Sequence, residues 1–132
     1  MTPQEFTDIA LWFPESTESR PYGPDALVYK VAEKSFAILA EGPTDEPARI
    51  TLKCDPALAL ELRAQFPSVT PGYHTDKRHW NTILLDGTVC DDELVEMTVH
   101  SYRRVVAGLR KADRDRLRTV LGEDAPPLPS TE

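Results

Sequence analysis

Cysteine is scarce in this sequence, and long hydrophobic runs are missing. The two cysteines, Cys54 and Cys90, stand alone, with neither a C-x-x-C pair nor the spacing of a metal site. We therefore expect two reduced thiols with structural or incidental roles, as in a cytoplasmic protein. No apolar run approaches the roughly 20 residues that cross a bilayer. Residues 1–5 lack the basic and apolar regions of a signal peptide, so we expect no membrane partner.

The sequence also lacks the motifs of common catalytic sites. It has no Gly-rich phosphate loop, no dinucleotide fingerprint and no nucleophile elbow to support a triad of Ser101, His79 and Asp86. His74 and His79, even with Asp76, supply fewer than the four ligands of a closed zinc site. We expect no catalytic residues, no metal and no cofactor, and hence a protein that is not an enzyme.

Positive charge is in the minority. The chain has 15 Lys and Arg against 22 Asp and Glu, and its net charge of −7 argues against general binding to nucleic acid. Cations nevertheless outnumber Asp113 and Asp115 in one region near the C-terminus. That region is either a basic face for an anionic partner or the solvated side of a terminal helix, whose dipole also favours cations. Its basic residues are Arg103, Arg104, Arg110, Lys111, Arg114, Arg116 and Arg118.

Length and patterning predict a single α+β domain over residues 1–121. Thr2, Pro3 and Glu5 form the capping pattern of a helix start, and Asp55-Pro56 starts a second helix similarly. Consecutive short strands favour a two-layer fold, with an antiparallel five-stranded sheet and helices on one face. The tail, 122–132, is rich in Pro and acid, and we expect it to be disordered. The predicted order is α-β-β-β-α-β-β-α, with strands at 27–31, 36–40, 49–53, 71–76 and 80–85 and a further short helix capped by Asp113.

Residues 71–87 are unusually dense in groups that can contact a ligand. Pro71-Gly72-Tyr73-His74 is followed by a run from Lys77 to Thr82 and then by Leu85-Asp86-Gly87. These motifs resemble the signature of the MmcQ/YjbR family of small bacterial proteins. The resemblance extends from about Phe6 to about Leu109, and further matching segments are Tyr29-Lys30-Val31, Lys53-Cys54-Asp55-Pro56 and His100-Ser101-Tyr102.

This resemblance implies both a fold and a candidate function. The fold has the element order given above, is related to that of type III secretion chaperones, and is broadly similar to frataxin-type domains. The function proposed for the family is DNA binding through a double wing, in which loops between strands project toward the duplex. The wings correspond here to the 32–35 turn and the 72–79 segment, with Lys34, His74, Lys77, Arg78 and His79 as candidate contacts.

The chemistry of individual residues extends this set. Lys77 and Arg78 suit phosphate contacts, Arg78 or Asn81 can reach base edges, and Tyr73 or Trp80 can stack on an unpaired base. The alternative interpretation is that Trp80 packs in the core, Tyr73 packs, and Lys77-Arg78 is a solvated turn. With the basic helix included, the candidate nucleic-acid contacts are Lys34, Tyr73, His74, Lys77, Arg78, His79, Asn81, Arg103, Arg104 and Arg110.

Three functions are consistent with the sequence. The first is weak, non-enzymatic binding of DNA, mainly through charge. The second, suggested by the net charge of −7 and the chaperone-like fold, is a protein-binding module that uses the open face of its sheet or a dimer surface. The third is binding of a small molecule. We expect a monomer or a weak homodimer.

Overall fold

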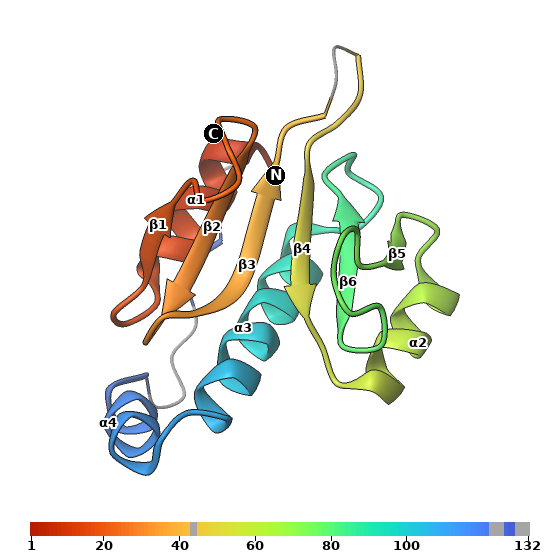
Figure 1. Cartoon of the computed structure of the whole chain (residues 1–132). Helices are drawn as coiled ribbons and strands as arrows, with labels where there is room; N and C mark the ends of the chain where they lie inside the picture. Colours follow the sequence, from red (N-terminus) through yellow and green to blue (C-terminus); the bar gives the residue numbers. More distant parts are fainter. Residues whose placement is uncertain (43–44, 122–125, 129–132) are drawn as a thin grey trace.

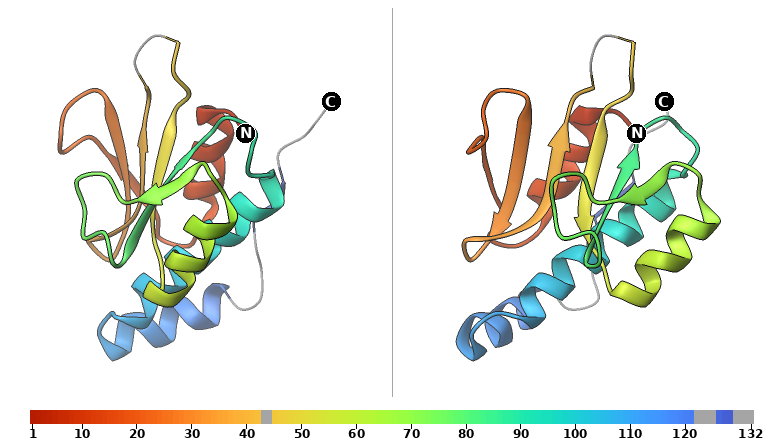
Figure 2. Two further views of the ribbon diagram at one scale, coloured as in Figure 1. Left: turned by 90° about the vertical axis from the view of Figure 1, so that its right-hand side faces the viewer. Right: turned by 45° about the vertical axis from the view of Figure 1, so that its right-hand side comes forward.

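The computed structural model describes residues 1–42, 45–121 and 126–128. One layer is a six-stranded antiparallel sheet, and helices lie against one of its faces (Figures 1 and 2). The predicted two-layer α+β architecture is therefore confirmed. The elements are α1 (Pro3–Trp12), β1 (Thr17–Ser19), β2 (Ala26–Val31), β3 (Lys34–Ala40), β4 (Arg49–Lys53), α2 (Pro56–Gln65), β5 (Val69–Pro71), β6 (Trp80–Leu84), α3 (Asp91–Ala107) and α4 (Lys111–Leu121).

The strand order across the sheet is β1-β2-β3-β4-β6-β5, and each neighbouring pair is antiparallel. The predicted five strands are one too few, because the residues of β1 are polar and all exposed. β1 is held by backbone pairing with β2, from Thr17↔Lys30 to Ser19↔Val28. Such pairing at a solvated edge leaves no alternation of apolar side chains to detect. The strand predicted at 71–76 begins earlier, at Val69, and ends at Pro71.

Alternation along the strands separates a helix-covered face from an open face. Tyr29, Leu52 and Ile83 lie on the covered face and are almost completely buried. Asn81 is paired with Leu52 and shares that face, whereas Trp80 is paired with Lys53 and faces the other way. The interpretation of Trp80 as a core residue is therefore wrong: it lies half-buried on the open face.

The helices begin and end largely where local chemistry predicts. The Thr2 Oγ1 accepts the Glu5 N–H at 3.1 Å and Glu5 Oε1 accepts the Thr2 N–H at 2.8 Å, which completes the predicted capping box of α1. Ser101 ties α3 to the sheet, because its Oγ accepts the Lys53 N–H at 2.9 Å. Helix α4 packs on α3 and begins before Asp113, which lies in its first turn and not at its cap.

Part of the predicted tail lies against α1. Residues 126–128 are described, and the rest of 122–132 lies outside the described residues. Pro126 is buried, and Pro126, Pro127 and Leu128 line a hollow together with Trp12. In the described parts of the chain, no helix has the length and apolarity needed to span a membrane.

Candidate functional site

The segment from Gly72 to His79 connects β5 to β6 and folds into a compact loop. Its base is closed by a hydrogen bond of 2.9 Å from the Gly72 N–H to the Trp80 carbonyl. A side chain at Gly72 does not fit, since a Cβ there would meet Thr75 Oγ1 and lie 2.7 Å from Trp80 Cβ. His74 turns the chain with a left-handed backbone conformation, φ 56°, which is uncommon outside glycine. The predicted wing is therefore a compact loop whose conformation requires glycine at position 72.

Arg63 of α2 holds this loop from the covered side of the sheet. Its Nε donates to Asn81 Oδ1 at 2.7 Å, and its Nη2 donates to the carbonyls of Trp80, at 3.2 Å, and Lys77. Asn81 also donates to the carbonyl of Ala59 at 3.3 Å and is only 2% exposed. The predicted base contact Asn81 is thus inside the protein, because its position on β6 faces the helices, and its amide is not presented to a ligand.

Tyr73 and His74 lie over the open face of the sheet. The Tyr73 N–H donates to Thr82 Oγ1 at 2.9 Å, and the Arg49 guanidinium carbon lies 4.4 Å from the centre of the Tyr73 ring. The imidazole of His74 packs on Tyr73, with ring centroids 3.9 Å apart. These side chains border a hollow of about 970 Å³, which we call the open-face hollow. Its acidic lining residues are Asp25, Glu41 and Asp76.

Strand register brings most of the predicted cations to one end of the sheet. Lys34 begins β3, and Lys53 ends β4 opposite Trp80, so the 32–35 turn and the base of the 72–79 loop share this end. The C-terminal half of α3 also reaches this end of the sheet, which points down in Figure 1, and α4 lies beside that half of the helix. We call this end of the sheet the basic end. Its cations are Lys30, Lys34, Lys53, Lys77, Arg78, Arg103, Arg104 and Arg110, and they outnumber its acids Glu33, Asp55, Asp76 and Asp113.

The opposite end of the sheet is acidic. There β2, β4 and α3 begin, and the Asp91 carboxylate lies 3.2 Å from the N-terminal ammonium of Met1. Although the net charge is −7, the two ends of the sheet therefore carry charges of opposite sign. The acidic end comprises Asp25, Glu41, Asp45, Glu46, Asp86, Asp91, Asp92 and Glu93, which outnumber Arg20, Arg49 and the N-terminal ammonium.

The predicted cations differ in how they are engaged. Lys34, Arg78 and Arg103 have exposed side chains. Lys77 is also exposed, and its Nζ donates to the Gly72 carbonyl at 2.9 Å. Two arginines are in ion pairs: Arg104 Nη1 lies 3.6 Å from Asp55 Oδ1, and Arg110 Nη2 lies 3.3 Å from Asp113 Oδ2.

The three histidines occupy separate environments. His79 Nε2 lies 4.0 Å from Asp76 Oδ2, while His74 packs on Tyr73. His100, which the sequence does not single out as a contact, accepts the Asp55 N–H on Nε2 at 3.1 Å. Among the residues that the structure describes, no three His, Cys, Asp or Glu side chains form a group that could hold a metal ion.

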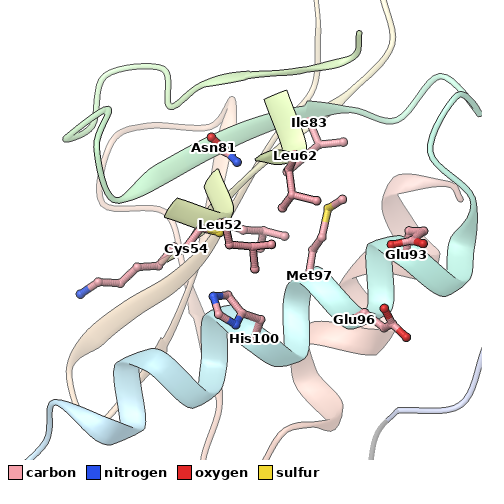
Figure 3. Close-up of a pocket in the computed structure, with 11 residues that line it drawn as sticks. Leu52, Cys54, Leu62, Asn81, Ile83, Glu93, Glu96, Met97 and His100 are labelled. Atoms are coloured by element: carbon pink, nitrogen blue, oxygen red, sulfur yellow. The ribbon is translucent and has the colours of Figure 1, made fainter. Parts of the chain in front are cut away.

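Helices α2 and α3 leave a hollow between them, with the sheet as its floor (Figure 3). We call it the α2–α3 slot, and its volume is about 280 Å³. Leu52, Leu62 and Met97 converge in it from the sheet, α2 and α3 respectively. Two glutamates stand on α3 at one end, and a thiol and an imidazole lie near the other (Figure 3). Its lining residues include Leu52, Cys54, Leu58, Leu62, Ile83, Glu93, Glu96, Met97 and His100.

The sequence carries only a weak signal for this slot. The spacing of Leu58, Leu62 and Phe66 predicts a buried stripe on α2, yet all three remain half-buried. Two of them, Leu58 and Leu62, line the slot, and Leu62 also packs against the core. Met97 and His100 recur at helical spacing on α3, but that spacing is equally typical of an ordinary packed helix.

Cys54 and His100, near one end of the slot, are uncharged at neutral pH. Burial, reinforced by the charge of Asp55, raises the pKa of the Cys54 thiol to about 11, so the thiol stays protonated. Burial, and then the charge of Arg104, lowers the pKa of His100 below its usual 6.5. Because Nε2 accepts a hydrogen bond, the neutral imidazole carries its proton on Nδ1.

Comparison with known proteins gives a consistent set of relatives. The YjbR family model matches residues 11–104. The chain is 33% identical over 110 residues to the uncharacterized protein YbdF of Escherichia coli O157:H7, across 83% of this chain and 88% of YbdF. It is also 33% identical over 106 residues to the uncharacterized protein YjbR of Escherichia coli strain K12, across 80% of this chain and 88% of YjbR.

Solved structures are similar over most of the chain. The crystal structure of the Deinococcus radiodurans protein DR2400, described by the domain DUF419, has a TM-score of 0.78 and 38% identity, covering 88% of this chain and 87% of that one. A crystal structure of a Pseudomonas syringae protein has a TM-score of 0.68 and 28% identity, covering 76% of this chain and 96% of that one.

Proposed function

Since this chain belongs to the YjbR family, we propose that it is a non-enzymatic protein that binds DNA through the phosphate backbone at its basic end. One observation carries the proposal: the separation of charge between the two ends of the sheet. A net charge of −7 repels DNA from a uniformly charged protein. A protein with a basic end can turn that end toward the duplex and keep its acidic end away.

The exposed cations suit backbone contact. Lys34 begins β3, directly after the β2–β3 turn, and Lys77 and Arg78 lie in the 72–79 loop, so both regions present charge at the same end of the sheet. Phosphate contacts of this kind position a protein on DNA without reading its sequence. The proposal leaves out Asn81, whose amide is buried, and gives Arg104 a minor part because Asp55 already pairs with it.

Fluorescence anisotropy with a labelled duplex, titrated across a salt series, tests this proposal. The wild type is compared with Lys77→Ala/Arg78→Ala and with Arg20→Ala, which removes a cation from the acidic end. We expect affinity to fall with salt, with a log–log slope of about −0.9 per phosphate neutralised. The slope should become shallower in the Lys77→Ala/Arg78→Ala variant and stay unchanged in Arg20→Ala. Absence of binding at low salt, or equal loss in both variants, contradicts the proposal.

The open-face hollow favours a second candidate, a protein-binding module for a basic extended segment. Its acidic residues suit cations, and its aromatic residues offer apolar surface and cation–π contact. Titration with a Lys-rich peptide and with a Glu-rich peptide of equal length tests this candidate. Preference for the Lys-rich peptide, weakened by Asp76→Asn but not by Asp92→Asn, supports it. The residues that carry it are Tyr22, Asp25, Glu41, Tyr73, Asp76 and Trp80.

Both candidates are proposed to act in the cytoplasm. DNA and unfolded protein segments are available there, and free thiols such as Cys54 and Cys90 remain reduced. The predicted monomer or weak homodimer stays a prediction, as does the lack of catalytic activity.

A further inference from the structure

The α2–α3 slot lies on the helix-covered face of the sheet, opposite the open-face hollow. It exists because α2 packs on β5 and β6 while α3 packs mainly on β3 and β4. A strip of the sheet lies between the two helices and forms the floor of the slot. Leu52 and Ile83 form this strip (Figure 3).

The floor and walls of the slot are apolar. Leu52 and Ile83 are 2% and 1% exposed, and Leu58 and Leu62 on α2 keep part of their surface uncovered. Met97 closes the α3 side, and its unbranched side chain adapts to ligands of different shape. A concave apolar surface bordered by a few polar groups is typical of a small-molecule site. The slot is small, so it suits a slender molecule.

The charged side chains available to the slot are acidic. Glu93 and Glu96 line it, and neither has an ion-pair partner within residues 1–42, 45–121 and 126–128. Lys53 lines it too, but it alternates with Leu52 along β4, which directs its side chain to the open face. Arg104 does not line the slot. Apolar walls with an acidic end are therefore complementary to an apolar molecule that carries a positive charge.

We propose that the α2–α3 slot binds a small amphipathic cation, an alkyl or aryl amine. Its apolar body lies between Leu62 and Met97, and its ammonium group meets Glu93 and Glu96. At the other end of the slot, the Nδ1–H of His100 offers a hydrogen bond to an acceptor on a longer ligand.

Three probes of one chain length test the proposal: hexylamine, hexanol and hexanoate. Binding is followed by the ¹³C shift of the Met97 methyl group, which reports from inside the slot. We expect the amine to bind most tightly and the carboxylate most weakly. The double variant Glu93→Gln/Glu96→Gln should weaken binding of hexylamine by roughly five- to tenfold and leave the affinity for hexanol unchanged. Asp92→Asn is the matched control, because Asp92 is exposed on the same helix and does not line the slot.

A variant that fills the slot, Leu62→Phe, should abolish the Met97 response to all three probes. Equal binding of amine and carboxylate, an amine affinity that the double Glu→Gln variant leaves unchanged, or an unshifted Met97 methyl each overturns the proposal. If Leu62→Phe fails to fold, the glutamate variants still decide the outcome. The result is independent of the DNA measurement, since Glu93 and Glu96 lie outside the basic end.

Discussion

At the scale of single residues, Gly72 is where the 72–79 loop is most sensitive to change. Gly72→Ala should destabilise the protein by roughly 1–3 kcal/mol, as expected for an overpacked position, because its Cβ would lie 2.7 Å from Trp80 Cβ. Gly108→Ala is the control, since a Cβ there would lie 3.6 Å from the Val105 carbonyl oxygen, an ordinary contact. Chemical denaturation measures both variants, and equal stabilities would refute the steric argument.

His100 should make stability depend on pH. Burial and the nearby charge of Arg104 lower its pKa below 6.5 in the folded protein, so the unfolded chain takes up the proton at higher pH. The stability linked to His100 is therefore complete above about pH 6.5 and is lost as the pH falls through the folded pKa. His100→Gln keeps an acceptor for the Asp55 N–H but does not titrate. Unfolding free energies at pH 7.5 and 5.0 should differ more in the wild type than in this variant.

The motif at residues 71–87 does not reveal by itself which of its residues can contact a ligand. Arg78, Trp80 and Asn81 are close together in the sequence, and all are plausible contacts from their chemistry. The strand that begins at Trp80 separates them, with Trp80 on the open face and Asn81 buried among the helices. Part of the motif thus serves the protein's own structure, through the close approach at Gly72 and the hydrogen bond from Arg63 to Asn81.

At the scale of elements, Arg63 couples α2 to the 72–79 loop. Arg63→Ala removes hydrogen bonds from a charged donor, each worth roughly 1.5–3 kcal/mol. We expect faster amide hydrogen exchange at Gly72, whose N–H bonds to the Trp80 carbonyl, a carbonyl that Arg63 also contacts. Arg118→Ala, on the exposed side of α4, should leave this exchange unchanged. Unaltered amide exchange at Gly72 in Arg63→Ala would show that the loop keeps its conformation without Arg63.

Elements with a local signal were predictable, and those that depend on neighbours were not. The capping box at Thr2 and the Asp55-Pro56 start identify two helices from a few residues each. Strand β1 has no such signal, because only its backbone pairing with β2 defines it. The α2–α3 slot depends on the spacing of two helices that lie on different strands of the sheet, which no local pattern encodes.

At the scale of the whole molecule, the position of a charge should matter more than the net charge. Glu33→Gln and Asp92→Asn each remove one negative charge from a chain whose net charge is −7. Only Glu33 lies beside Lys34 at the basic end. The seven-residue β3 alone separates the two ends by about 20 Å, beyond the Debye length of about 10 Å at 0.1 M salt. Glu33→Gln should therefore tighten duplex binding in the anisotropy assay more than Asp92→Asn does. Equal effects would mean that the total charge governs binding.

Both edges of the sheet are strands of only three residues. β1 is polar and fully exposed, and β5 ends at Pro71, which has no N–H to offer. Neither edge presents a long row of unpaired backbone groups to another chain. We therefore expect concentrated solutions to resist fibril formation. If two copies associate, they should meet through side-chain surfaces and not by joining their sheets into one.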